Sequence, residues 1–121
     1  MAVMTYQLRV EDWLAACFSK EVREDRQERT HRFLEEALEL AQANGCSRED
    51  AKALVEYVYS RPEGKPELEV GGVMVTLASL CIATGINMGE AGDRELERNW
   101  ERIAIIREKQ AAKPHGSPLP Q

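Results

Sequence analysis

Three glutamates lie close together in the chain. Glu35, Glu36 and Glu39 form the pattern E-E-x-x-E. On a helix, side chains three or four residues apart lie about 5–6 Å apart at Cβ, so carboxylates at this spacing repel one another unless a cation neutralises them. Mg²⁺ prefers oxygen ligands and is commonly held by carboxylates, water and substrate phosphates. The pattern is therefore a candidate magnesium site. The alternative interpretation is a solvated acidic face that Arg32 partly neutralises.

A second acidic pair opens the most apolar segment of the chain. Glu67 and Glu69 precede the apolar run from Val70 to Ile86. Acidic residues in a first helical turn complement the helix dipole, and this explanation suffices for Glu67. If the apolar helix is central, however, its first turn brings Glu69 near the helix that carries E-E-x-x-E. For Glu69, a metal-ligand role and a dipole role both stay open.

Basic residues precede the acidic cluster. Arg29 lies two turns before Glu36, and guanidinium groups suit bidentate contact with phosphate. The alternative is that these basic residues pair with neighbouring glutamates on a solvated helix. The sequence contains neither the G-x-x-x-x-G-K-S/T phosphate loop nor a G-x-G-x-x-G motif.

The elements that must position these residues are helices. Apolar residues recur at helical spacing, and few segments alternate with period two. Asn44-Gly45 is typical of a helix end, and Pro62 ends the next helix by disfavouring the α conformation before it. The expected helices span residues 10–18, 25–43, 47–61 and 67–84, with a last helix from 87 onward. We expect an all-α fold, a bundle of four or five helices.

Charge and hydropathy limit the partners. The formal net charge is -5, which argues against a nucleic-acid-binding protein because such faces cluster positive charge. The apolar run is shorter than the roughly 20 residues of a membrane span and is interrupted by glycine and hydroxyl residues. It predicts a buried helix at the centre of the bundle or across a subunit interface. We therefore expect no membrane partner, and assembly as a homodimer or homotetramer.

Cysteine usage and the two ends of the chain predict location and domain limits. The three widely spaced cysteines match no zinc or redox pattern, and the N-terminus lacks a signal-peptide layout. Both features are typical of a cytoplasmic protein with free thiols. Residues 1–110 are predicted to form a single helical domain. The proline-rich segment 111–121 has little to bury and predicts a disordered tail.

The order of these features resembles the MazG-type all-α nucleoside triphosphate pyrophosphohydrolases. E-E-x-x-E on one helix is followed by an acidic residue that opens an apolar helix, then by Gly-Ile-Asn at 85–87 and a charged helix. The family carries E-E-x-x-E and E-x-x-D. It uses Mg²⁺ to split NTPs or dNTPs into monophosphate and pyrophosphate.

The resemblance, which covers about residues 29–99, assigns roles by position. It implies that Mg²⁺, or Mn²⁺ in its place, bridges the phosphates. It also implies that Glu36 or Glu39 orients or deprotonates the attacking water. The implied metal ligands are Glu35, Glu36, Glu39 and Glu69. The implied phosphate contacts are Arg98 and Asn99, which join Arg29.

One position departs from the family pattern. The Asp of E-x-x-D falls on Gly72, which has no oxygen side chain, and the chain reads Glu69-Val70-Gly71-Gly72. A glycine pair is costly in a helix, so it predicts close approach by another helix or room for a ligand. The main hypothesis is an Mg²⁺-dependent nucleoside triphosphate pyrophosphohydrolase. The alternatives are a degenerate, non-catalytic module that binds a nucleotide or a partner protein, and a purely structural helical module.

Overall fold

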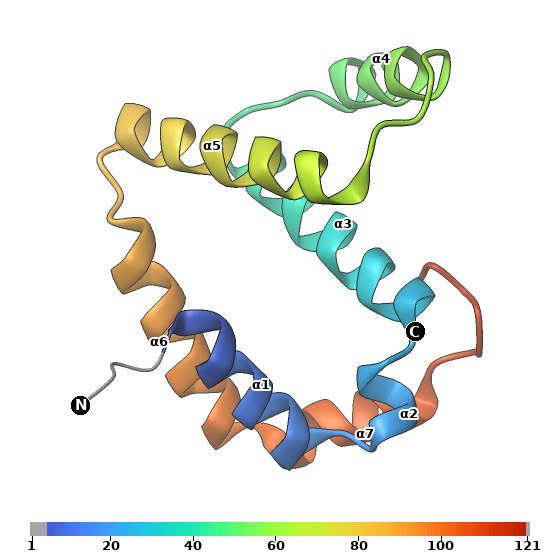
Figure 1. The fold of residues 1–121 in the computed structure, drawn as a ribbon, viewed down its shortest axis with the longest axis vertical. Coiled ribbons are helices and arrows are strands. Elements are labelled where there is room, and N and C mark those ends of the chain that lie inside the picture. Colours follow the sequence, from blue (N-terminus) through green and yellow to red (C-terminus); the bar gives the residue numbers. More distant parts are fainter. Residues whose placement is uncertain (1–4, 121) are drawn as a thin grey trace. The chain divides into compact units, whose positions relative to one another are not determined.

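The computed structural model describes residues 5–120 of the chain. Within that range it contains α-helices and no strand, which confirms the all-α prediction. Residues 1–4 of the predicted domain and residue 121 of the predicted tail lie outside the described residues. The helices are α1 (Tyr6–Cys17), α2 (Lys20–Arg23), α3 (Arg26–Ala43), α4 (Arg48–Tyr59), α5 (Pro66–Thr84), α6 (Met88–Glu101) and α7 (Ile103–Ala112), as Figure 1 shows.

Side-chain caps fix the start of two helices at the predicted positions. The Asp25 carboxylate accepts a hydrogen bond from the Glu28 backbone N–H at 3.1 Å, at the start of α3. The Ser47 hydroxyl accepts one from the Asp50 N–H at 3.1 Å, at the start of α4. Each cap satisfies an N–H group that has no partner inside the helix.

Glycine fixes the end of two helices. Gly45 and Gly85 follow α3 and α5 with positive φ angles of 85° and 71°. In this conformation the chain can turn back on the last helical carbonyls, and the Ile86 N–H donates to the Cys81 carbonyl at 2.9 Å. Other residues rarely adopt it, so the glycine positions predicted both helix ends correctly.

The first helix begins at Tyr6 rather than at residue 10, and two interruptions differ from the expected helices. The last helix, expected to run unbroken from residue 87, is split into α6 and α7 at Arg102, whose φ is -111°. The Arg102 N–H donates to the Asn99 carbonyl at 3.2 Å, three residues back, so the regular helical ladder stops there. A short α2 also stands between the first two expected helices, because Ser19 caps it through the Val22 N–H.

The chain divides into two compact units, and each is described by itself. The terminal unit comprises Met1–Glu36 and Gly89–Gln121, and the central unit comprises Ala37–Met88. Helix α3 contributes its first part to the terminal unit and its last part to the central unit. The single-domain prediction for residues 1–110 stays a prediction.

The terminal unit has a small apolar core. Trp13, Cys17 and Leu96 are buried there, and the Trp13 ring meets the Phe18 ring edge-on at 5.9 Å. The Arg107 guanidinium donates to the Cys17 carbonyl at 2.7 Å and so ties α7 to the end of α1. Burial raises the pKa of the Cys17 thiol. These contacts hold α1, α6 and α7 together around the pocket described below.

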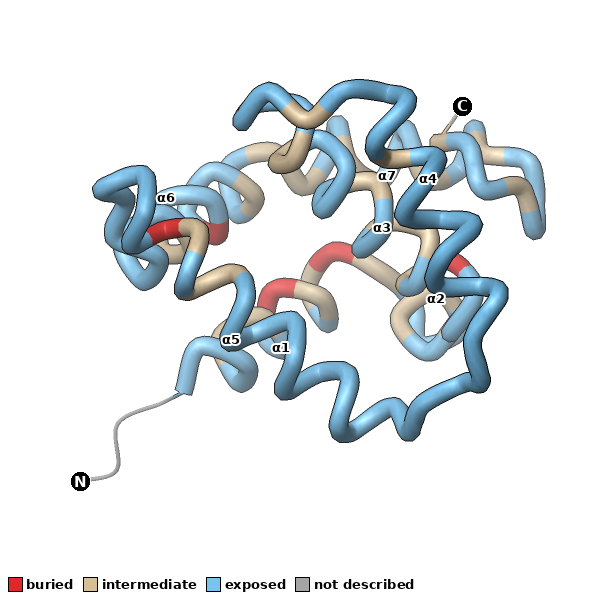
Figure 2. The backbone as a smooth tube through the Cα atoms, turned by 90° about the horizontal axis from the view of Figure 1, so that it is seen from above, coloured by how far each residue is buried: buried red, intermediate tan, exposed pale blue. Residues whose placement is uncertain are grey.

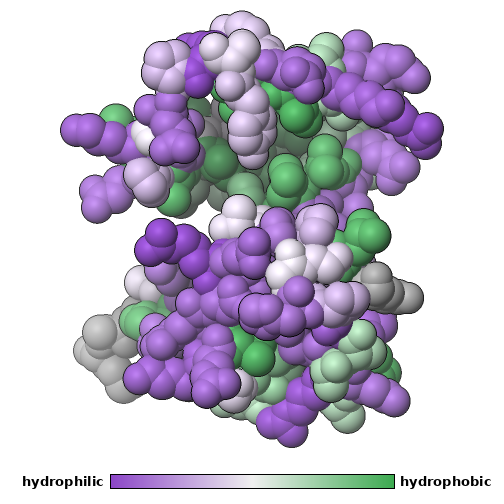
Figure 3. Space-filling view, turned by 90° about the vertical axis from the view of Figure 1, so that its right-hand side faces the viewer, coloured by the Kyte–Doolittle hydropathy of each residue, from purple (hydrophilic) through white to green (hydrophobic). Residues whose placement is uncertain are grey.

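The central unit buries little of its apolar surface. In α5, Cys81 is the buried residue, whereas Val75 and Ile82 are 70% and 83% exposed. Figure 2 shows α4 and most of α5 in the pale blue of exposed residues, and Figure 3 shows hydrophobic residues in green at the surface of this unit. Within the central unit this helix is therefore little buried, and its burial at the centre of a bundle or across a subunit interface stays a prediction.

The apolar helix α5 also has features of a membrane-spanning helix. By length and composition alone, α5 is long and apolar enough to cross a membrane. The core helices of soluble proteins pass the same test but are mostly buried, whereas the apolar window of α5 is 0% buried among the described residues.

Candidate active site

A pocket of about 490 Å³ lies in the terminal unit, lined by residues from α1, α3, α6 and α7. We refer to it as the candidate active site. Its wall includes the side chains of Trp13, Phe18 and Ile106, so part of the lining is apolar. Its carboxylates are Glu35, Glu36 and Glu95, and its cations are Arg29, Arg32, Arg102, Lys109 and Lys113. Cations outnumber carboxylates, so the pocket attracts anions.

Helix α3 brings two of the three clustered glutamates to this pocket. Glu35 and Glu36 are adjacent in sequence, and both line it. The Glu35 carboxylate lies 3.3 Å from the Arg32 guanidinium, and the Glu35 side chain is 34% exposed. Arg32 therefore partly neutralises Glu35, as the solvated-face interpretation expected, while Glu35 keeps access to solvent.

The arginines of α3 carry buried N–H groups without hydrogen-bond partners among the described residues. These are the Nε of Arg29 and the Nε and Nη1 of Arg32. Arg32 lies at ion-pair distance from Glu28 and Glu35, at 3.6 and 3.3 Å, but these contacts do not satisfy the two N–H groups as hydrogen bonds. A buried donor without a partner is destabilising. A ligand rich in acceptor oxygens, such as phosphate, fits these donors.

Arg29 also has an unusual electrostatic environment. Burial lowers the pKa of its guanidinium, and the neighbouring Glu28 carboxylate opposes that effect. The guanidinium lies over the Phe18 ring, 5.3 Å from the centroid. A partly desolvated guanidinium binds an anion more strongly than one in bulk water, because the local dielectric screens the charges less.

The structure brings together four residues that the sequence nominated. Arg29, Glu35 and Glu36 come from α3, and Asn99 comes from α6, and all four line the candidate active site. Arg29 and Asn99 are the predicted phosphate contacts, and the two glutamates are predicted metal ligands. Residues far apart in sequence thus converge on one pocket.

Three other predicted residues lie elsewhere. Glu39 lines a separate pocket at the end of α3. Glu69 lines another, beside Arg61, between the end of α4 and the start of α5. Arg98 lies on α6 and pairs with Glu95 at 3.4 Å, with its side chain 63% exposed. None of the three lines the pocket that holds Glu35 and Glu36.

Sequence reasoning did not single out the basic residues of the C-terminal helix. Arg102, Lys109 and Lys113 line the candidate active site together with Ile106. Together with Ile106 they are spaced by four, three and four residues, and this spacing is typical of one helical face. That stripe was a usable signal, but a basic stripe by itself is equally typical of a solvated helix.

The carboxylates of the pocket fit a metal only in part. In the described part of the chain, no three His, Cys, Asp or Glu side chains are grouped to hold a metal ion. Mg²⁺, however, is usually bound through one or two carboxylates together with water and substrate phosphates. Glu35 or Glu36 therefore suits a magnesium ion that arrives with a phosphorylated ligand, although adjacent side chains on a helix do not face each other. They do not form a cage that would bind the metal alone.

The glycine pair of α5 has open surroundings. Apart from the backbone of the helix itself, no described atom lies within 4 Å of a Cβ built on Gly71 or Gly72. No other helix of the central unit therefore makes the close approach that the pair predicted. An Asp side chain, as in the family pattern, has room at Gly72.

Comparisons with known proteins add no relative. No family model matches the chain, and no curated protein or solved structure matches it significantly.

Proposed function

We propose that the chain is a MazG-like, Mg²⁺-dependent nucleoside triphosphate pyrophosphohydrolase that converts NTP or dNTP to monophosphate and pyrophosphate. One observation carries the proposal: the candidate active site joins Glu35 and Glu36 to an excess of cations with unsatisfied guanidinium donors. This donor set suits a phosphate chain that brings a divalent cation with it. In the same proposal the protein is cytoplasmic and assembles as a dimer or tetramer of helical bundles.

In the proposed reaction, the residues of the pocket have different roles. Arg29, Arg32 and Asn99 bind and orient the phosphates. Glu36 holds or deprotonates the attacking water, which needs a base within hydrogen-bond reach. Mg²⁺, when bound, supplies positive charge at the phosphate oxygens. The side chains of Trp13, Phe18 and Ile106 form the apolar part of the wall, against which the nucleoside can lie.

Three residues belong to the proposal by resemblance alone. Glu39 is the second candidate for the base and a further metal ligand, Glu69 a metal ligand, and Arg98 a phosphate contact. They line other parts of the described chain, so the proposal depends first on Glu35 and Glu36.

The experiment measures pyrophosphate release from a panel of NTPs and dNTPs, with Mg²⁺ and then with Mn²⁺. We expect release from one or a few nucleotides and none after chelation of the metal. Glu36→Gln should lower kcat at least about 100-fold, because general-base catalysis contributes roughly 10²–10⁴-fold. The matched control is Glu11→Gln, at an exposed position of α1, which should retain full turnover. Undiminished turnover in a folded Glu36→Gln variant would refute the assignment.

Gly72 favours a second candidate function, a non-catalytic nucleotide-binding module. The family Asp is missing at this position, and the described carboxylates form no three-membered metal group. This candidate predicts nucleotide binding without pyrophosphate release. Gly72→Asp discriminates, since the position has room for the side chain. A gain of release in this variant would show that the rest of the site is competent, whereas nucleotide binding with no gain would favour the binding module.

A further inference from the structure

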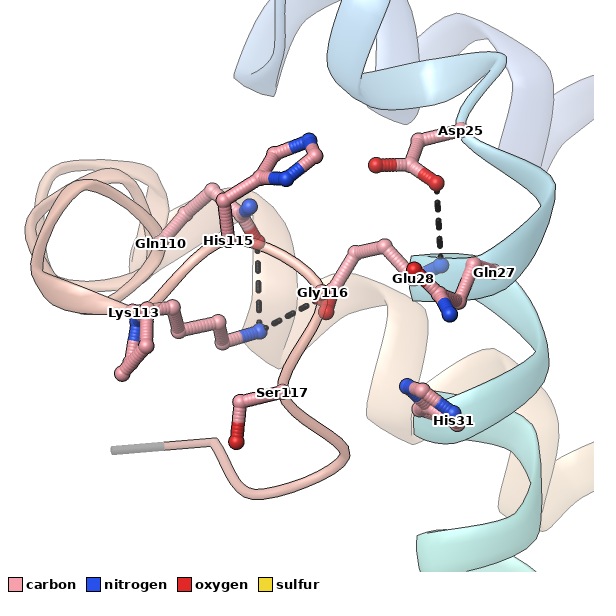
Figure 4. Close-up of a pocket in the computed structure, with 10 residues that line it drawn as sticks. Asp25, Gln27, Glu28, His31, Gln110, Lys113, His115, Gly116 and Ser117 are labelled. Carbon is pink, nitrogen blue, oxygen red and sulfur yellow. Dashed lines mark hydrogen bonds and ion pairs between the residues drawn. The ribbon is translucent and has the colours of Figure 1, made fainter.

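The C-terminal segment after α7 folds back against the first half of α3. We call residues 113–120 the tail strap. At its start, Lys113 Nζ donates to the Glu28 carboxylate at 2.7 Å and to the Gln110 side-chain carbonyl at 3.1 Å. Figure 4 shows Lys113 reaching from the end of α7 toward Glu28 on α3. The side chains of Lys113 and Glu28 are 12% and 11% exposed, so water screens this ion pair little.

A turn then redirects the strap. Gly116 has a φ of 79°, in the left-handed region that favours glycine. The Ser117 N–H donates to the Pro114 carbonyl at 3.3 Å and closes the turn. A Cβ on Gly116 would lie 3.6 Å from the Gln27 side chain of α3, so the turn is seated against that helix.

Beyond the turn, the strap reaches the candidate active site. Arg32 donates a hydrogen bond from Nη2 to the backbone carbonyl of Pro118. Pro120 lines the same pocket as Glu35 and Glu36. The strap therefore occupies a donor of the very guanidinium whose Nε and Nη1 lack hydrogen-bond partners in the described chain.

The end of the tail strap is held to the candidate active site by few contacts. Leu119 is 64% exposed, so the end of the strap buries little apolar surface. The Arg32 contact is to a neutral carbonyl, and a phosphate oxygen forms a stronger, charge-assisted bond with the same guanidinium. A phosphate oxygen therefore competes favourably with the Pro118 carbonyl for this guanidinium.

We infer that the tail strap is an autoinhibitory segment that covers the phosphate-binding end of the candidate active site and is displaced by a phosphate chain at Arg32. The inference rests on the proposed function, because it concerns regulation of the same pocket. The Lys113–Glu28 pair acts as the hinge. It lies at the start of the strap, and residues 116–120 are the part that moves.

The experiment compares pyrophosphate binding, in the presence of Mg²⁺, by three forms of the protein in titration calorimetry. The first is the intact chain, and the second ends at His115, which keeps the Lys113–Glu28 pair. The third is full-length Gly116→Val, whose β-branched side chain does not tolerate the positive φ. We expect both variants to bind pyrophosphate about tenfold more tightly, the equivalent of one charge-assisted hydrogen bond no longer in competition. The matched control is Pro118→Ala, which keeps the backbone acceptor and should bind like the intact chain.

Parallel measurement of pyrophosphate release separates this inference from the proposed function. Tighter binding in the two variants without release from any nucleotide supports the strap and refutes the hydrolase. Release with equal pyrophosphate affinity in all forms supports the hydrolase and overturns the strap. Failure of every folded form to bind pyrophosphate overturns the strap, and failure of every form to release it overturns the hydrolase.

Discussion

At the residue scale, Glu28 forms ion pairs with three basic side chains of the terminal unit. It is 9% exposed, and its carboxylate lies 2.7 Å from Lys113, 3.4 Å from Arg29 and 3.6 Å from Arg32. A buried carboxylate is stable only when it is paired and hydrogen-bonded. Glu28 lies one turn before Arg32, so it holds the arginines of the candidate active site in place without lining that pocket itself.

Glu28→Gln tests this role. The substitution keeps the size of the side chain but leaves Lys113, Arg29 and Arg32 without their shared counter-charge. We expect the free energy of unfolding to fall by about 2–3 kcal/mol, near the lower end of the cost of removing one partner from a buried ion pair. Urea unfolding followed by circular dichroism measures it. Glu24→Gln, at an exposed position nearby, is the control and should change stability little. An unchanged unfolding midpoint for Glu28→Gln would show that the cluster contributes no net stability.

At the element scale, α5 holds two kinds of glycine with opposite physical roles. Gly72 lies inside the helix and, apart from the helix backbone, no described atom lies within 4 Å of its Cβ position. Gly85 ends the same helix at a φ of 71°. A side chain is therefore favourable at the first position and strained at the second.

Gly72→Ala and Gly85→Ala form a matched pair for testing this difference. Gly72→Ala should raise the free energy of unfolding by about 1 kcal/mol, the difference in helix propensity between the two residues. Gly85→Ala should lower it by about 1 kcal/mol, because a Cβ is unfavourable in the left-handed conformation. Urea unfolding of both variants and of the wild type measures the two changes in the free energy of unfolding. A loss of stability in Gly72→Ala would instead reveal a neighbouring chain packed against the glycine pair.

At the scale of the whole molecule, the apolar surface that the central unit exposes is a candidate site of association. Val75 and Ile82 lie seven residues apart on one face of α5, and both are largely exposed. Large exposed apolar surfaces in soluble proteins mark sites of association. A second copy of the chain is the partner that our proposal of a dimer or tetramer supplies.

The oligomeric state tests that proposal. Light scattering coupled to gel filtration at micromolar concentration should give a mass of two or four chains. The double substitution Val75→Glu and Ile82→Glu should shift the protein toward monomer or insolubility, because it places charge in the covered face. The apolar control Val75→Leu and Ile82→Leu should keep the wild-type mass. A monodisperse wild-type monomer would contradict the proposal, and flotation of the protein with phosphatidylcholine vesicles would point to lipid as the covering partner.

The sequence by itself determined the helices and many of their ends. Apolar spacing, the caps at Asp25 and Ser47 and the glycines after α3 and α5 act within a few residues of one another, so they can be read without tertiary structure. The same local logic placed Glu35 and Glu36 side by side on a helix. It missed the break at Arg102, where no glycine or proline marks the end of α6.

Only the tertiary structure decided which residues meet. Asn99 and Lys109 join Glu35 in one pocket because α6 and α7 pack beside α1 and the first part of α3. Glu39 and Glu69 line pockets of the central unit. Their association with Glu35, which the sequence pattern suggested, stays a prediction. The tail strap, which composition predicted to be disordered, lies against α3 through contacts at Glu28 and Arg32. These outcomes depend on charges and apolar surfaces brought together from distant parts of the chain, and helical spacing carries no information about such contacts.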